Sequence, residues 1–425
     1  MNLREDLIAF IKGKKETNFY FQTLTLSDSL LSIGYAFSQF IGLRKGNKAK
    51  RDFLEIIKQD YQYKECFLFG SARSSLYALL KALNYDTGSE ILITGFTCEV
   101  VPNAIINAGF IPIYIDINLS DYCMDPNQVE NAITDKTKAI IIQHTFGIPA
   151  QMDKLLKITS KYNLYVIEDC AVSLGSKYKG QLTGTFGDAA IFSFELSKTI
   201  TSGWGGMLVI NSEKENAPYL ANEFYHTVPE QKFKQRVKTL LQLGSSGLLY
   251  QSRIYILGKY LIAVFFKFKI FSPSTTTEEY NGKIHPNYLV KLSNEQIKVL
   301  SRQYKRLTQI IQQKEFFKKK YLKGFSDYLK TEFIELVNKK DVVLIRFPIL
   351  IENRPKASDW FESNRIELGY WFTAPLSSRA IDHSIYYYKT GCCPNSEYIS
   401  RRIINLPLIK ECDNIISKKA LFINK

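Results

Sequence analysis

Histidine is scarce in this chain, and its cysteines are not arranged for metal binding. Only four histidines occur among 425 residues, and they lie far apart. The seven cysteines include no Cys-x-x-Cys pair, and an odd number of cysteines cannot all pair in disulfides. The sequence therefore argues against a zinc site and against a disulfide framework. A reducing cytoplasm fits this cysteine usage better.

Long uncharged apolar runs are also missing. The segment Met1–Asp6 carries charges of both signs and leads into no signal-peptide pattern. Two apolar segments, Phe19–Leu43 and Thr239–Phe271, lie beside or contain lysines and arginines. Neither offers the roughly 18 uncharged apolar residues of a membrane-spanning helix.

Two interpretations stay open for these apolar segments. The favoured one is a pair of helices buried against the core or at a subunit interface. The other is peripheral contact with the inner membrane surface through residues 19–51 or 239–271, because an apolar stretch beside a basic cluster can lie in a membrane interface.

Positive charge is in excess, with 56 Lys and Arg against 41 Asp and Glu and a formal net charge of +15. The basic residues are scattered and no nucleic-acid-binding motif occurs, so we expect no nucleic-acid partner. The excess serves solubility, or it attracts an anion such as a nucleotide diphosphate, a phosphorylated cofactor or an acidic membrane surface.

Between the two apolar segments, strand-like stretches alternate with helical patterns, which predicts an α/β fold with a mostly parallel sheet wrapped by helices. The expected strands are Glu90–Thr94, Ile111–Asp116, Lys138–Gln143, Leu164–Asp169, Ala189–Phe194 and Gly206–Ile210, and the expected helices are Ser71–Leu83, Cys98–Ala108 and Gln151–Lys161. Ligands of such sheets bind at the carboxyl ends of the strands.

The chain length suits one large and one smaller domain. We expect an N-terminal apolar and basic extension over residues 1–60. A large domain follows over 61–280, with an apolar insertion at 226–275, and a smaller C-terminal domain covers 281–425. In that last part we expect a long helix beginning with Ser293–Leu307, a strand within Val342–Ile351 and a turn at Asn405–Pro407.

An acidic residue and a lysine follow two of the expected strands. Asp169 ends the apolar stretch Leu164–Glu168, and Lys198 comes shortly after the strand that ends in Phe194. Pyridoxal phosphate (PLP) needs this pairing. The lysine forms a Schiff base with the cofactor, and the aspartate keeps the pyridine nitrogen protonated.

Several motifs in this region resemble those of the DegT/DnrJ/EryC1/StrS aminotransferases, in the same order and at similar spacing. They are Ile167–Ala171, Leu174–Gly175, Gly184–Asp188, Phe192–Phe194 and Lys198. The resemblance extends from about Cys66 to the C-terminus, with a weak patch between His226 and Tyr280. It implies fold type I of the PLP-dependent transferases: a large, mostly parallel sheet with helices on both faces, and a smaller C-terminal α+β domain.

The resemblance also implies an activity. Such enzymes take an amino group, here expected from glutamate, and transfer it to a keto group of a nucleotide-diphosphate-linked sugar. Their amino sugars serve polysaccharide or natural-product biosynthesis. The resemblance further implies a homodimer with active sites between the subunits.

Further cofactor contacts follow from the same resemblance. Ser193 stands where the family binds the cofactor phosphate. Ala72, Arg73 and Ser74 match the last three positions of the family's phosphate-binding turn. They open an expected helix, and a helix N-terminus favours an anion.

The chain departs from the family pattern at several positions. Cys98 stands where many members place an aromatic ring over the cofactor, and Val172 stands where a glutamine or histidine is usual. In the family, an asparagine and an arginine from the neighbouring subunit reach the active site. Leu289 and Lys291 stand at those two positions here, and Asn287 is close by in the sequence.

Two further places are candidates for substrate binding. His144 follows an expected strand, and Trp371 with Phe372 matches a family segment that lines the sugar pocket. A purely structural role stays open for all three residues.

Two rival functions remain. Sugar dehydratases of the same family replace the Schiff-base lysine with histidine, so Lys198 argues against that branch. A non-catalytic or membrane-associated relative is suggested by Cys98, Val172 and the apolar segments. The retained pair of Asp169 and Lys198 argues against it.

Overall fold

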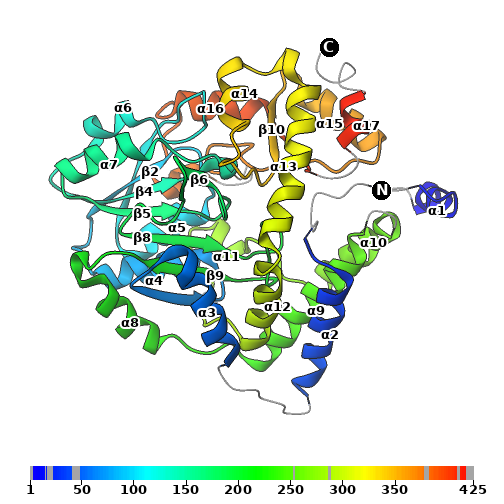
Figure 1. Ribbon diagram of the computed structural model, residues 1–425, viewed down its shortest axis with the longest axis horizontal. Helices are drawn as coiled ribbons and strands as arrows, with labels where there is room; N and C mark the ends of the chain where they lie inside the picture. Colours follow the sequence, from blue (N-terminus) through cyan, green and yellow to red (C-terminus); the bar gives the residue numbers. More distant parts are fainter. Residues whose placement is uncertain are drawn as a thin grey trace.

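A mostly parallel sheet of seven strands lies at the centre of this computed structural model (Figure 1), which describes residues 3–14, 16, 23–40, 48–251, 254–285, 289–377, 382–408 and 412–417. The strand order is β1-β9-β8-β5-β4-β2-β3. Strands β3, β2, β4, β5 and β8 run parallel, and β9 runs antiparallel to β8 and β1. The bounds are β1 (Glu65–Phe69), β2 (Glu90–Thr94), β3 (Ile111–Ile115), β4 (Thr137–Gln143), β5 (Tyr165–Asp169), β8 (Ala189–Ser193) and β9 (Gly206–Ile210).

Helices cover both faces of the sheet, which explains why its strands are apolar on both sides. In β5, Ile167 packs into the cluster on one face, whereas Val166 packs with Met152 and Leu155 on the other. One face carries α4 (Ala72–Leu83), α5 (Val100–Ala108) and α8 (Ala217–Thr227), and the other carries α3 (Lys48–Tyr61), α7 (Met152–Lys161) and α12 (Asn294–Tyr304). The predicted α/β class with helices on both faces is confirmed.

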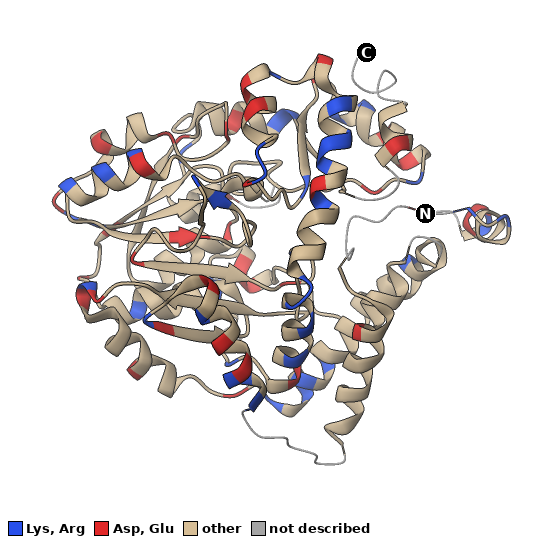
Figure 2. Cartoon of the chain, in the orientation of Figure 1, with Lys and Arg blue, Asp and Glu red and all other residues tan. Residues whose placement is uncertain are grey.

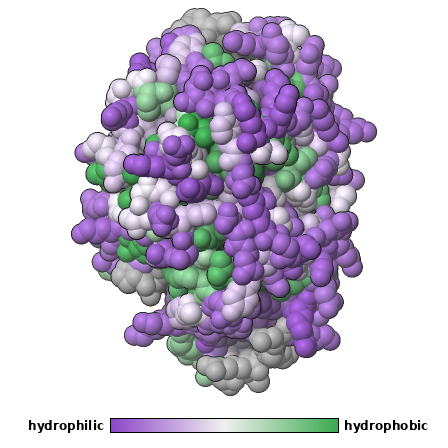
Figure 3. Space-filling model, turned by 90° about the vertical axis from the view of Figure 1, so that its left-hand side faces the viewer, coloured by the Kyte–Doolittle hydropathy of each residue, from purple (hydrophilic) through white to green (hydrophobic). Residues whose placement is uncertain are grey.

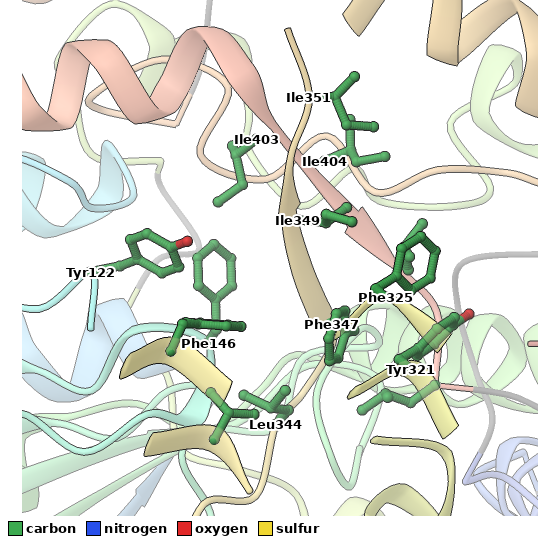
Figure 4. Packing of buried hydrophobic residues seen from close by; sticks show 14 of the residues in the cluster. Tyr122, Phe146, Tyr321, Phe325, Leu344, Phe347, Ile349, Ile351, Ile403 and Ile404 are labelled. Carbon is green, nitrogen blue, oxygen red and sulfur yellow. The ribbon is translucent and has the colours of Figure 1, made fainter. Parts of the chain in front are cut away.

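The C-terminal part has its own core around Phe347 (Figure 4). The Phe347 ring lies 5.1 Å from the ring of Tyr321. Phe146, which follows β4, belongs to the same cluster and ties this part to the sheet. The elements here are α13 (Leu307–Gly324), α14 (Thr331–Val337), β10 (Phe347–Leu350), α15 (Arg354–Ser363), α16 (Pro394–Arg402), β11 (Ile403–Leu406) and α17 (Cys412–Ser417).

The turn expected at Asn405–Pro407 is wrong, because Asn405 and Leu406 end strand β11. That strand pairs antiparallel with β10, with Asn405 opposite Pro348. The expected long helix is divided into α12 and α13 at Lys305 and Arg306. The domain boundaries at residues 60 and 280 stay a prediction.

The two apolar segments form helices that pack against each other (Figure 1). Helix α2 (Leu26–Ser38) lies on α9 (Phe233–Leu249). A Cβ added at Gly244 would lie 2.8 Å from the Ser29 carbonyl oxygen, and one at Gly247 would lie 2.1 Å from the Ser29 hydroxyl oxygen. These glycines therefore permit the close helix–helix contact.

A further helix pair lies beside this one. Helix α10 (Tyr255–Lys267) packs on α1 (Leu3–Ile11), and Lys259 forms ion pairs with Asp6 at 2.9 Å and Glu16 at 2.8 Å. Among the described residues, no helix combines the length and apolar character required to cross a membrane. Residues 19–22 and 41–43 of the first apolar segment lie outside the described residues.

Candidate active site

A cavity of about 160 Å³ opens at the carboxyl ends of β4, β5 and β8. Asp169 ends β5 and lies opposite Gln143 of β4 and Ile191 of β8. Lys198 lies in the loop that follows β8. The predicted residues that line the cavity are Ala72, Arg73, Cys98, Asp169, Val172, Ser193, Lys198, Trp371 and Phe372. Two predicted residues, Ser74 and His144, do not line it.

The Lys198 amine has an environment that favours its neutral form. Burial lowers the pKa of this amine; the negative charge of Glu195 opposes the shift, and the positive charge of Arg346 adds to it. The nitrogen lies 4.6 Å from the centre of the Trp371 ring. An amine with a lowered pKa is a better nucleophile at neutral pH.

Asp169 is a buried carboxylate at the other side of the cavity. Burial raises the pKa of its carboxyl, while a hydrogen bond from the Ala171 N–H at 3.0 Å and the charge of Lys198 oppose the shift. Within the described part of the chain, no ion pair joins Asp169 to Lys198. The space between the two side chains therefore remains open to a ligand that needs both.

The first turn of α4 meets the end of the sheet and forms a site for an anion. Ser193 lies opposite Gly206 in the β8–β9 pair. A Cβ at Gly206 would lie 2.3 Å from the Ala72 nitrogen, so only glycine lets the strand approach the helix this closely. The first N–H groups of a helix lack partners within it and favour an anion. The Ala72 and Arg73 amides and the Ser193 hydroxyl thus suit a phosphate.

Ser74 differs from the expectation. Its N–H donates to the Ser71 hydroxyl oxygen at 3.2 Å, and the two hydroxyl oxygens lie 2.7 Å apart. Ser74 is fully buried. Ser74 therefore completes the N-terminal cap of α4, and its expected place among the phosphate contacts has no support in this geometry.

Trp204 is a cavity residue that sequence reasoning missed as a ligand contact. Its indole N–H is buried and has no hydrogen-bond acceptor among the described residues. Arg73 lies 5.9 Å from the Trp204 ring and donates to the Ser274 carbonyl oxygen at 2.8 Å. The only sequence signal for Trp204 was its place in the run Gly203–Gly206. Its N–H is a further donor for a phosphate.

The residues present therefore fit PLP. Amide, hydroxyl and indole donors gather at one end of the cavity, and a buried carboxylate and a lysine of lowered pKa line the remainder. These groups match a phosphate, a pyridine nitrogen and an aldehyde, respectively.

The departures from the family pattern are visible in the cavity wall. The Cys98 thiol donates to Glu99 Oε2 at 3.3 Å, and burial raises the pKa of this thiol. Val172 offers no hydrogen-bonding group. The ring of Trp371 lies beside the Lys198 amine. Phe372 stacks on Phe96, with ring centres 4.8 Å apart, and mainly serves packing.

The structure places His144 in the protein interior rather than in the cavity. Its Nδ1 accepts the Ala150 N–H at 3.1 Å, and its Nε2 lies 3.0 Å from Glu168 Oε2. Because Nδ1 is an acceptor, the ring proton lies on Nε2 and is donated to Glu168. The prediction of a substrate contact is therefore not supported by the geometry.

Glu168 holds the segment before β8 through several donors. Its oxygens also accept the N–H groups of Gly184, Phe186 and Gly187 at 2.8, 2.7 and 2.7 Å. Both oxygens are thus occupied by donors. The bonds that Glu168 forms with His144 and with the N–H groups of residues 184–187 hold the backbone next to Asp169 in place.

The positions expected to reach the neighbouring subunit lie away from the cavity. The Lys291 amine lies 4.9 Å from the Tyr225 ring centre, and Leu289 packs against the cluster around α4 and α8. Asn287 lies outside the described residues.

Comparison with known proteins identifies the family of this chain. A model of the DegT/DnrJ/EryC1/StrS aminotransferase family matches residues 42–250 and 261–415. Uncharacterized protein MJ1066 of Methanocaldococcus jannaschii is 40% identical over 162 residues, which are 38% of this chain and 42% of that protein. GDP-perosamine synthase of Escherichia coli O157:H7 is 32% identical over 258 residues, which are 58% of this chain and 70% of that protein.

A solved structure shares the fold. Helicobacter pylori PseC, an aminotransferase involved in the biosynthesis of pseudoaminic acid, is 19% identical, with a TM-score of 0.72 over 97% of this chain and all of that one. The family model covers most of the sequence, including the strand ends that form the cavity. The chain belongs to the DegT/DnrJ/EryC1/StrS aminotransferase family.

Proposed function

We propose that this protein is a PLP-dependent aminotransferase that places an amino group on a keto group of a nucleotide-diphosphate-linked sugar. The observation that carries the proposal is the shared cavity of Lys198 and Asp169. When bound, PLP supplies the electron sink that lets an amino group pass between two carbonyl compounds.

Each side chain of the cavity has a separate proposed role. Lys198 Nζ would hold the cofactor, and its amine would take the proton from the substrate carbon that bears the amino group. Asp169 would hold a proton on the ring nitrogen, and its bond to Ala171 keeps the carboxylate oriented. Ser193, Trp204 and the α4 amides would hold the phosphate.

The substrate class is supported by the relatives. One of them is named GDP-perosamine synthase, after a nucleotide-linked amino sugar. Lys198 stands where the family's dehydratases carry histidine, which favours amino transfer over dehydration. We further propose glutamate as donor, a homodimer, a cytoplasmic location and a role in polysaccharide or natural-product synthesis.

The proposal is tested by a half-reaction. The PLP-loaded protein is mixed with glutamate, and the visible absorption of the cofactor and the release of 2-oxoglutarate are followed. We expect the visible band to fall as one equivalent of 2-oxoglutarate forms per active site. A spectrum unchanged by glutamate, glutamine and aspartate would refute the proposal.

Peripheral membrane contact is a second proposal, carried by exposed apolar side chains. On α1 and the α10 region they are Leu3, Leu7, Ile8, Ile11, Leu261, Val264, Phe266, Phe268 and Ile270. Lys267 and Lys269 lie among them. In contrast, the side with α6 (Pro126–Val129), α7 and α8 is largely hydrophilic (Figure 3).

Vesicles containing phosphatidylglycerol test this contact. We expect the protein to sediment with them at low salt and less with uncharged phosphatidylcholine vesicles, because the lysines attract anionic lipid. Protein that stays in the supernatant under both conditions would assign these faces to protein contacts instead.

A further inference from the structure

A second, larger cavity of about 800 Å³ opens beside the first. The two cavities share the lining residues Ser71, Arg73, Trp204 and Ser274. Arg73 is held at this boundary by Ser274 and by an ion pair with Glu279. A molecule that fills both cavities would therefore pass the first turn of α4.

The second cavity is strongly basic. Lys232, Lys234 and Lys238 come from the start of α9, and Lys269 follows α10. Among the described residues, these lysines form no ion pair. Burial lowers the pKa of Lys238, and the positive charge of Lys269 lowers it further, so the two amines lie close enough to repel each other. Figure 2 shows basic residues where α9 begins, and none follows Lys238 in this helix.

Acidic residues do not balance this charge. The wall holds two glutamates, Glu278 and Glu279. Glu279 is engaged, since it pairs with Arg73 and accepts the Thr276 N–H at 2.9 Å. Glu278 is exposed; backbone hydrogen bonding lowers the pKa of its carboxyl, and His285 and Lys269 add to this. One exposed carboxylate thus faces four lysines.

Uncharged polar groups complete the wall. The side-chain oxygens of Gln231 and Gln235 are buried without a hydrogen-bond partner among the described residues. Gln231 is only 4% exposed. A buried acceptor without a donor is costly, and a hydroxyl group of a sugar-bearing ligand could donate to these oxygens, whereas a phosphate oxygen could not.

We propose that this basic pocket, lined by Lys232, Lys234, Lys238 and Lys269, binds the diphosphate group of the substrate. Its role in turnover rests on the proposed function, because a sugar linked to a diphosphate must place that group next to the reacting ring. Four lysines offer donors for charge-assisted hydrogen bonds to phosphate oxygens.

The position of the basic pocket indicates a function for the apolar insertion. Helix α9 supplies three of the lysines and the segment after α10 supplies the fourth. The apolar contacts of α9 with α2 thus hold a basic wall against the mouth of the reaction cavity.

The test measures binding rather than turnover. The PLP-loaded protein, in which the first phosphate site is filled, is titrated with inorganic pyrophosphate by calorimetry. We expect the double variant Lys238→Met, Lys269→Met to bind at least tenfold more weakly. The double variant Lys238→Arg, Lys269→Arg should bind within about threefold of the parent protein, since the charges remain.

A matched control is Lys157→Met on α7, an exposed lysine outside both cavities, whose pyrophosphate affinity should equal that of the parent. Thermal melting and cofactor absorption confirm that each variant is folded. Pyrophosphate that binds the methionine double variant as tightly as the parent, or that binds neither, overturns the proposal.

Competition identifies the source of the diphosphate. Displacement of pyrophosphate by GDP or UDP supports a nucleotide-linked substrate, and displacement by farnesyl diphosphate supports a lipid-linked one. Displacement by neither overturns the proposal. If glutamate produces no spectral change but pyrophosphate binding depends on the lysines, only the catalytic proposal fails.

Discussion

Replacing Lys198 with alanine is expected to abolish amino transfer. The variant loses both the covalent attachment of the cofactor and the amine that moves the proton at the substrate carbon. Loss of a positioned acid–base group alone costs about 10²–10⁴-fold in rate, so the combined loss should exceed this. The measurements are the visible absorption of the PLP-loaded protein and 2-oxoglutarate release from glutamate.

Two comparisons make the Lys198→Ala result specific. Lys81→Ala, at an exposed position on α4, should keep the spectrum and the rate of the parent. Added methylamine should restore part of the activity of Lys198→Ala, because it supplies the missing amine. A Lys198→Ala protein with more than a tenth of the parent activity would show that another residue carries the chemistry.

The substitution Asp169→Asn should give the second largest effect. Asparagine keeps the size of the side chain but cannot hold a proton on the ring nitrogen as an anion does. We expect kcat to fall by about 10²–10⁴-fold, while the cofactor still binds through its phosphate and Lys198. The steady-state rate and cofactor content of the purified variant provide the measurement.

The same substitution, Asp169→Asn, should raise the stability of the cofactor-free protein although it lowers kcat. Burial raises the pKa of the Asp169 carboxyl, so the ionised group destabilises the cofactor-free folded state above that pKa. Without cofactor, Asp169→Asn should therefore melt at or above the temperature of the parent at pH 7 to 8. The gain should vanish at acid pH, where Asp169 is protonated. Asp52→Asn, at an exposed site, serves as the control for the melting experiment.

In the activity experiment, full activity of Asp169→Asn would exclude the role assigned to Asp169.

The central strands could be predicted from sequence almost to the residue. Glu90–Thr94 and Gly206–Ile210 coincide with β2 and β9, because a sheet covered on both faces produces uninterrupted apolar segments. The family match confirms the resemblance, the fold class and the cofactor inferred from those motifs. Lys198, Asp169 and Ser193 also line one cavity, although their individual roles stay predictions.

Features that depend on distant contacts could not be predicted. The sequence around Asn405 signals a turn, but pairing with β10 makes it a strand. His144 follows a strand, as many site residues do, yet its bonds to Glu168 and Ala150 hold it in the interior. The hydrogen bond of Arg73 to Ser274 and its ion pair with Glu279 join residues more than 200 positions apart.

The two adjoining cavities share Ser71, Arg73, Trp204 and Ser274, but their main chemical groups come from separate stretches of the chain. Asp169, Ser193 and Lys198 lie at or after the ends of β5 and β8, whereas the four lysines come from the start of α9 and from Lys269. Evolution can therefore exchange the helical insertion while the catalytic strands stay unchanged. Such an exchange would alter which diphosphate-linked group of the substrate the enzyme prefers. Grafting α9 and α10 onto a relative would transfer that preference without rebuilding its chemistry.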